Sequence, residues 1–217
     1  MRMHLNVPDL FLVRQIKDLN GDKTDSYVTQ GIAMKIEYPE IGICGLSCRL
    51  CPMYHSEGKS RCGGCKSEFR IAAGCPFITC AIKKKQTEFC WDCTEHQICE
   101  KWSKHREAGK KHDSFKCYQK LEDDITFIQE NGVKEFERLQ KTREKLLKEM
   151  LRGFNEGRSK RYYCIAATVF EIDELQKLVN TGIERSKGLE MKEKSKILHS
   201  LLDSAAEKKN RLLKLRK

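Results

Sequence analysis

Ten cysteines within a window of 56 residues constrain this chain more than any other feature of its sequence. They lie between Cys44 and Cys99, whereas the rest of the 217-residue chain holds only Cys117 and Cys164. Such density is typical either of disulfides in a small secreted domain or of metal ligation in an intracellular protein. Residues 1–21 carry several charges and no apolar run of signal-peptide length, and no stretch of the chain approaches a membrane span. We therefore expect a cytoplasmic protein whose thiols are available for metal.

The spacing of the cysteines favours metal ligation. In each of three pairs, two residues separate the two cysteines, and this spacing lets a turn bring both sulfurs to one tetrahedral ion. The simplest grouping takes contiguous cysteines that end in such a pair. It predicts one four-cysteine site from Cys48, Cys51, Cys62 and Cys65 and a second from Cys75, Cys80, Cys90 and Cys93.

Two cysteines of the cluster, Cys44 and Cys99, remain outside this grouping. They are candidates for further ligands, with His96 or His55 as the partner in a third, mixed site, although both histidines are more typical of surface side chains. All ten cysteines are therefore candidate metal ligands. Thiolate sites suit zinc and iron–sulfur clusters alike, so we expect two or more zinc ions, with an iron–sulfur cluster as the alternative.

The fold class expected from the sequence is mainly α, with a small irregular cysteine-rich metal-binding module and a C-terminal helical bundle. The module, over residues 44–112, has too few apolar side chains to offset the entropy of ordering it, and structural zinc contributes an apparent ~10 to 16 kcal/mol per site. The expected organisation is an N-terminal extension at 1–43 with a short helix and a strand, the module, a helical region at 113–188 and a basic C-terminal helix at 189–217.

Positive charge is concentrated in the second part of the chain. Residues 101–217 hold 29 basic and 19 acidic side chains, whereas residues 1–100 hold 13 and 12. A basic surface can bind nucleic acid or an acidic protein, although many such charges simply solvate helices. Two groups are the candidates for binding an anion or a partner, and they are Arg158, Lys160 and Arg161 at a helix start and Lys208, Lys209 and Arg211 near the C-terminus. Cys164, between aromatic and aliphatic neighbours, is more typical of a packed side chain than of a reactive thiol.

The cysteine pattern also resembles a known family. It is similar to the pattern of a cysteine-rich family of uncharacterised proteins, the domain of unknown function 3795. The matching positions are Cys44-Gly45-Leu46, Cys48, Cys51-Pro52, Cys62, Gly64-Cys65, Cys80, Cys90, Cys93 and Cys99, and the stretch 154–164 also resembles the family. The resemblance covers roughly residues 40 to 180. It implies a metal module of unknown role and assigns no reaction.

The sequence favours a non-enzymatic protein. It contains no nucleotide-binding glycine loop, no H-E-x-x-H motif and no nucleophile elbow. Sites built from cysteine alone are usually closed and structural. We therefore expect a metal-binding protein that acts as a binding or adaptor protein through its basic helical surface, with an iron–sulfur redox or metallocofactor accessory protein as the alternative.

Overall fold

The structure is a computed structural model that describes residues 35–217 apart from 59, 60 and 74. Residues Glu37–Lys217 form a compact unit of their own. The helix and the strand expected within residues 1–38 lie largely outside the described residues, and no strand begins at 35–38. Among the residues that are described, no helix combines the length and the apolar character that crossing a membrane requires.

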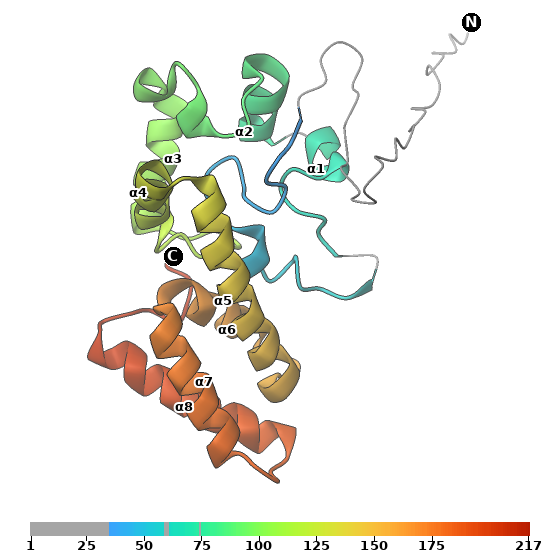
Figure 1. The fold of residues 1–217 in the computed structure, drawn as a ribbon, viewed down its shortest axis with the longest axis vertical. Coiled ribbons are helices and arrows are strands. Elements are labelled where there is room, and N and C mark those ends of the chain that lie inside the picture. The colour runs from blue at the N-terminus through green and yellow to red at the C-terminus, as the bar shows by residue number, and fades with distance from the viewer. Residues whose placement is uncertain (1–34, 59–60, 74) are drawn as a thin grey trace, which may run out of the picture. The chain divides into compact units, whose positions relative to one another are not determined.

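The described chain is mainly helical, as predicted from its sequence (Figure 1). Short helices and single turns occupy the cysteine-rich segment, and longer helices follow. The short elements are η1 (Cys48–Leu50), α1 (Glu68–Ala73), α2 (Pro76–Ile78), the π-helical η3 (Thr79–Lys85), η4 (Cys90–Asp92) and η5 (His96–Ile98). The longer helices are α3 (Glu100–Lys111), α4 (Leu121–Asn131), α5 (Val133–Phe154), α6 (Lys160–Val169), α7 (Ile172–Arg185) and α8 (Met191–Lys208).

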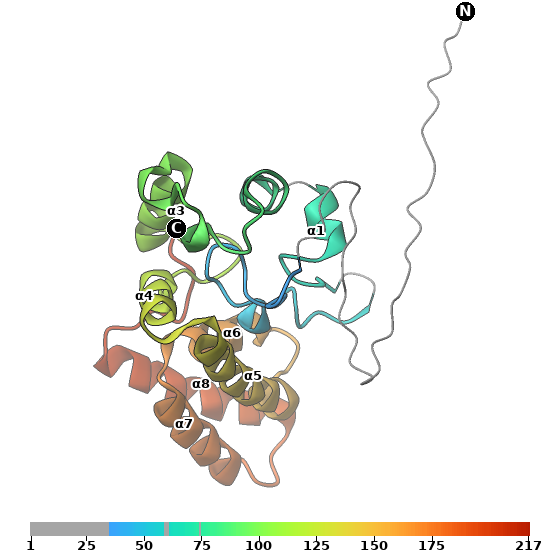
Figure 2. The same ribbon diagram turned by 45° about the horizontal axis from the view of Figure 1, so that its top comes forward.

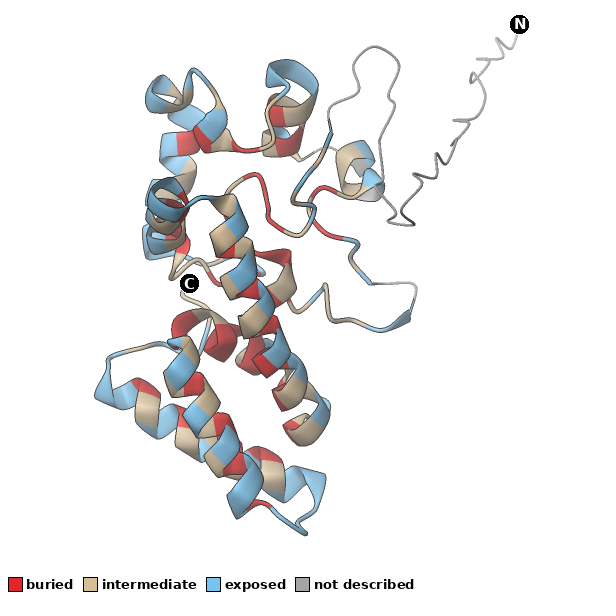
Figure 3. Cartoon of the chain, in the orientation of Figure 1, coloured by how far each residue is buried: buried red, intermediate tan, exposed pale blue. Residues whose placement is uncertain are grey.

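The largest apolar core lies among the last four helices. In both ribbon views α5 lies against α6, and α7 lies against α8 (Figures 1 and 2). Buried positions recur along all four helices (Figure 3) because apolar residues in each return at helical spacing. Met150 and Phe154 of α5 and Leu198 of α8 are among its fully buried side chains. Leu50 of η1 also belongs to this core, so the cysteine-rich segment reaches into the bundle.

A second core joins the cysteine-rich segment to α4. Ile41, Leu46 and Trp91 pack there with Leu121 and Ile125. This core crosses residue 112, where the sequence suggested that the cysteine module ends. The segment therefore does not depend on its own few apolar residues, because α4 and the start of α5 supply the rest of its core.

Two helix boundaries differ from those expected. The C-terminal helix does not run to the end of the chain, because α8 ends at Lys208 and residues 209–217 continue as turns and irregular chain. That segment is held instead by Arg216, whose backbone N–H and guanidinium bind the carboxylate of Asp113. Asp113 in turn accepts a hydrogen bond from the N–H of Tyr118 at 2.5 Å, and the helix expected after Asp113 begins only at Leu121.

Candidate metal centre

The first pair of cysteines lies on a tight turn. Cys48 begins η1, and the N–H of Cys51 donates to the carbonyl of Cys48 at 3.0 Å. The N–H of Cys65 donates to the sulfur of Cys48 at 3.2 Å, which links the first pair to the second. Gly64, directly before Cys65, has a φ of +106°, a conformation that favours glycine.

Shared cationic neighbours show that the four cysteines of the first predicted site lie in one region. The guanidinium of Arg70 hydrogen-bonds to the thiol of Cys62 and interacts electrostatically with Cys65 and Cys51, so the Arg70 pKa is raised. The thiols of Cys48 and Cys65 hydrogen-bond to each other, and this lowers the pKa of Cys48 and raises that of Cys65. The pair therefore favours one thiolate, which is the form that binds metal.

Lys116 provides the clearest sign that this region is built for an anionic centre. Its side chain is buried, with 6% of the residue exposed, and its Nζ has no hydrogen-bond partner among the described residues. Burial by itself lowers the Lys116 pKa, but the negative charges of the surrounding cysteines raise it above its ordinary value. Those cysteines are Cys48, Cys65, Cys51 and Cys44. A four-thiolate zinc site carries a formal charge of about −2, so these residues fit such a group.

Lys66 is a second buried cation beside the same thiols. Only 1% of this residue is exposed, and its Nζ lies 2.6 Å from Oε1 of Glu88, 3.1 Å from the carbonyl of Tyr38 and 3.8 Å above the ring of Phe89. Burial lowers its pKa to about 8, although Glu88 and the neighbouring Cys48 and Cys65 oppose that change. Unlike Lys116, this ammonium is fully satisfied without a metal.

The second group of cysteines gathers around Cys90. Its N–H donates to the carbonyl of Ile43 at 3.0 Å, which places it beside the segment that carries Cys44. Burial raises the Cys90 pKa to about 12, and the charges of neighbouring thiols add to that effect. In decreasing order of effect these are Cys44, Cys99, Cys80 and Cys93.

Two cysteines left unassigned by the sequence, Cys44 and Cys99, are thus neighbours of Cys90. Cys75 lies just before α2 and packs against an apolar cluster with Ile43 and Ile78, which Cys90 also contacts. Cys44 is close to the first group as well, since a Cβ added to Gly42 would lie 3.6 Å from its sulfur and 3.9 Å from that of Cys65.

The described thiols are near one another without converging on a point. All twelve cysteines are unpaired, and over residues 35–217 with their gaps no three cysteine, histidine or carboxylate side chains are placed closely enough to hold a metal ion as they stand. In each of the two candidate histidines one ring nitrogen is close to a carbonyl: Nε2 of His55 lies 2.6 Å from the carbonyl of Arg49, and Nδ1 of His96 lies 2.9 Å from that of Cys93.

The two cysteines outside the cluster are core residues. Cys117 and Cys164 are both buried in the main core. Burial raises the pKa of Cys117 to about 11 and that of Cys164 to about 12. The prediction that Cys164 packs as a small apolar side chain is confirmed by this burial, and both thiols are protonated near neutral pH.

The predicted basic residues separate into two groups. Arg158, Lys160 and Arg161, at the start of α6, line one groove together. At the other end of the chain, Lys209 and Arg211 both pair with Glu174, at 2.9 and 2.7 Å, while Lys208 is exposed. The C-terminal group is therefore largely engaged within the molecule.

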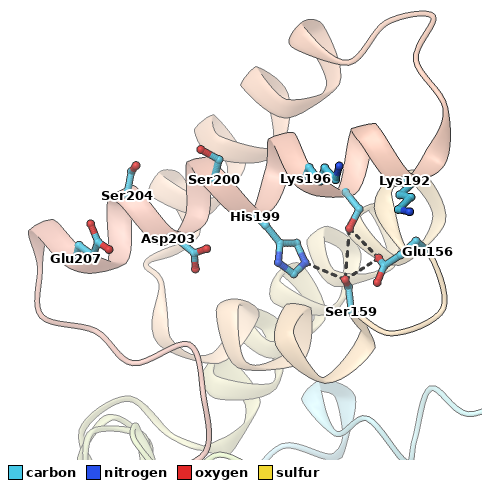
Figure 4. Close-up of a pocket in the computed structure, with 10 residues that line it drawn as sticks. Glu156, Ser159, Lys192, Lys196, His199, Ser200, Asp203, Ser204 and Glu207 are labelled. Atoms are coloured by element: carbon cyan, nitrogen blue, oxygen red, sulfur yellow. Dashed lines mark hydrogen bonds between the residues drawn. The ribbon is translucent and has the colours of Figure 1, made fainter.

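A polar network between α6 and α8 was not predicted from the sequence (Figure 4). Oε2 of Glu156 accepts hydrogen bonds from the hydroxyls of Ser159 and Ser195, each at 2.7 Å. Nε2 of His199 lies 2.8 Å from the Ser159 hydroxyl, and the ring of Tyr162 stacks on the imidazole at 4.0 Å. Burial by itself raises the Glu156 pKa, but the two serine hydroxyls lower it to about 2.

This network borders a groove of about 600 Å³ but does not have the arrangement of a catalytic triad. In a triad the carboxylate binds the imidazole and orients it, whereas Glu156 accepts from the two serines. The hydroxyls of Ser159 and Ser195 are themselves on buried residues. The network therefore ties α6 to α8. Its members are far apart in sequence and follow no motif, so no sequence signal identifies them.

The fold and the candidate site together define a mainly helical, cysteine-rich protein whose clustered thiols are surrounded by buried cations. No family model, no curated protein and no solved structure matches the chain.

Proposed function

We propose that this chain is a zinc-binding protein without catalytic activity, which uses its basic helical surface to bind an anionic partner. The observation that supports this most directly is Lys116, a buried ammonium without a hydrogen-bond partner among the described residues. It lies near Cys44 and near three cysteines of the first predicted site, Cys48, Cys51 and Cys65. An uncompensated buried charge is costly in a folded protein. A zinc centre would hold the neighbouring cysteines as thiolates, the charged form that raises the pKa of Lys116.

In this proposal the first zinc is held by the cysteines that share Arg70 and Lys116. The second is held around Cys90, where the structure favours Cys99 over Cys75 as the fourth ligand. The two proposed sets are Cys48, Cys51, Cys62 and Cys65, and Cys80, Cys90, Cys93 and Cys99. Cys44 lies near both sets and is the candidate for a shared or replacement ligand. Zinc closed by four thiolates supplies folding free energy and leaves no open coordination position for chemistry.

An iron–sulfur cluster is the second candidate, because cysteine thiolates bind either group. The position of Cys44 near both sets favours it, since a cluster has more than one metal atom to ligate. The similarity to the uncharacterised cysteine-rich family is compatible with either metal. In this alternative the chain would be a redox or metallocofactor accessory protein.

Metal analysis of protein purified without oxygen distinguishes these candidates. We expect a colourless protein with about two equivalents of zinc, and a cobalt-substituted form with the visible spectrum of tetrahedral thiolate ligation. A brown protein containing iron and acid-labile sulfide would favour the cluster instead. A folded protein that retains neither metal would refute the proposal.

Single serine variants test the ligand sets. Cys99→Ser should lose about one equivalent of zinc, whereas Cys75→Ser should retain both. The opposite result would restore the grouping by contiguous cysteines. Cys117→Ser is the matched control, because Cys117 is buried outside the cluster and its replacement should not change the metal content.

A further inference from the structure

A groove beside the first zinc ligands has the chemistry to bind an anionic polymer. It has a volume of about 590 Å³, which is in the range of ligand-binding pockets. One wall begins directly after Cys51, with Pro52 and Met53. The first turn of α6 and residues 213–215 form the others.

The charged residues of the groove all have the same sign. They are Arg158, Lys160, Arg161 and Lys214, and no carboxylate is among the lining residues that the structure describes. None of these four makes an ion pair within the described part of the chain, in contrast to Lys209 and Arg211. Among the described residues, only Lys160 of these four makes a hydrogen bond through its side chain, a long one of 3.4 Å from its Nζ to the hydroxyl of Ser56. The cations are thus available to an external anion.

The rest of the lining is apolar and partly aromatic. Phe115 and Met53 are 52% and 41% exposed and line this one groove together. Tyr162 and Ile165 line the same groove from α6. A ligand that fits must therefore combine negative charge with flat apolar groups.

We propose that this groove binds a segment of single-stranded nucleic acid, with phosphates on Arg158, Arg161 and Lys214 and a base against Phe115. Single-stranded nucleic acid presents phosphates and unpaired bases in alternation, and proteins bind it by combining a basic groove with aromatic side chains. An acidic peptide suits the groove less well, because carboxylates make no use of the aromatic and aliphatic side chains. This inference rests on the proposed function, since it names the anionic partner of the basic surface.

Fluorescence polarisation with the zinc-loaded full chain tests this inference. The probe is a labelled single-stranded RNA of mixed sequence, and the competitors are the duplex of the same sequence and a polyglutamate peptide. We expect the single strand to bind more tightly than either competitor. We also expect the affinity to fall with salt, with a logarithmic slope of about −0.7 per phosphate contact.

Two variants separate the charged from the aromatic contribution. Arg158→Ala/Arg161→Ala should weaken RNA binding and reduce the salt slope by about 1.4, because two phosphate contacts are lost. Phe115→Ala should weaken binding by roughly tenfold and leave the salt slope unchanged, because stacking is lost. The matched control is Arg185→Ala/Lys187→Ala, which removes two exposed cations at the end of α7.

The outcomes distinguish the inference from the proposed function. Preferred binding of polyglutamate, equal binding of duplex, or equal losses in the groove and control variants would overturn the inference and leave the zinc-binding proposal intact. Binding of neither RNA nor polyglutamate would refute both the inference and the proposed anionic partner. If the folded protein retains neither zinc nor iron as purified and still binds RNA, the result would support the groove and refute the metal centre.

Discussion

Replacing the buried ammonium of Lys116 should have opposite effects on the metal-bound and metal-free protein. In the metal-free protein Lys116→Met removes a buried charge that has no hydrogen-bond partner among the described residues. Leaving such a donor unsatisfied costs about 1 to 3 kcal/mol or more while the surrounding thiols are protonated, so under those conditions the metal-free variant should be more stable than the metal-free parent. With zinc bound, the same substitution removes the counter-ion of a thiolate centre.

The size of the second effect follows from electrostatics. A unit charge about 4 to 6 Å from another interacts by ~3 to 4 kcal/mol at an effective dielectric constant near 20. This is an upper limit for the effect on metal affinity, because charged cysteines already interact with Lys116 before metal binds. Loss of a residue that supports metal ligands typically weakens metal affinity by ~10- to 100-fold. We therefore expect Lys116→Met to weaken zinc binding by about that factor.

Competition with a chromophoric zinc chelator measures this affinity, and thermal unfolding of chelator-treated protein measures the stability of the metal-free form. Lys120→Met is the matched control, because its ammonium is partly exposed and pairs with Asp123 at 2.6 Å. Its zinc affinity should equal that of the parent. Zinc binding by Lys116→Met that is as tight as in the parent would refute the assignment of Lys116 to the metal centre.

Three further predictions concern the helical part. Arg49→Met should lower the free energy of unfolding in urea by about 2 kcal/mol, because Lys148 then remains as the ion-pair partner of the buried Glu144. The control Arg138→Met removes an exposed ion pair and should change the free energy of unfolding by less than ~0.5 kcal/mol. Glu156→Gln should cost about 1 kcal/mol at pH 7 after allowing for solvent screening. The difference in stability between parent and variant should disappear as the pH falls from 4.5 toward 2, because the Glu156 carboxylate stabilises the fold only while it is charged. A difference that stays constant over this range would show that the charge of Glu156 is not its cause. Leu202→Ala should cost ~2 to 5 kcal/mol, because this side chain is fully buried among the last four helices, and a smaller loss would mean that the bundle repacks.

The bundle could be predicted from the sequence because its apolar residues repeat at helical spacing. The stripe from Phe136 to Phe154 corresponds to α5, and the buried run around Ala166 and Ala167 corresponds to α6. Helix α3 was missed because it is mostly charged and buries only Trp102 and Gly109, although an acidic first turn and a basic last turn are typical of a helix.

The cysteine groups were predictable only in part. Spacing identifies residues that share a turn, and the structure places the first predicted set in one region. Spacing does not identify neighbours that reach the site from elsewhere in the chain. Lys116 comes from the segment between α3 and α4, and Cys99 lies just before α3, so both positions depend on tertiary packing.

The three residues of η1 each belong to a different part of the structure. Cys48 faces the other thiols, Arg49 makes ion pairs with Glu40, Glu137 and Glu144, and Leu50 is buried among the last four helices. If Cys48 binds the proposed zinc and the turn loosens when that metal is lost, Leu50 would leave the bundle and a cavity would remain. Chains made during zinc shortage would then expose apolar surface to proteases and chaperones, and the abundance of this protein in the cell should follow the supply of metal.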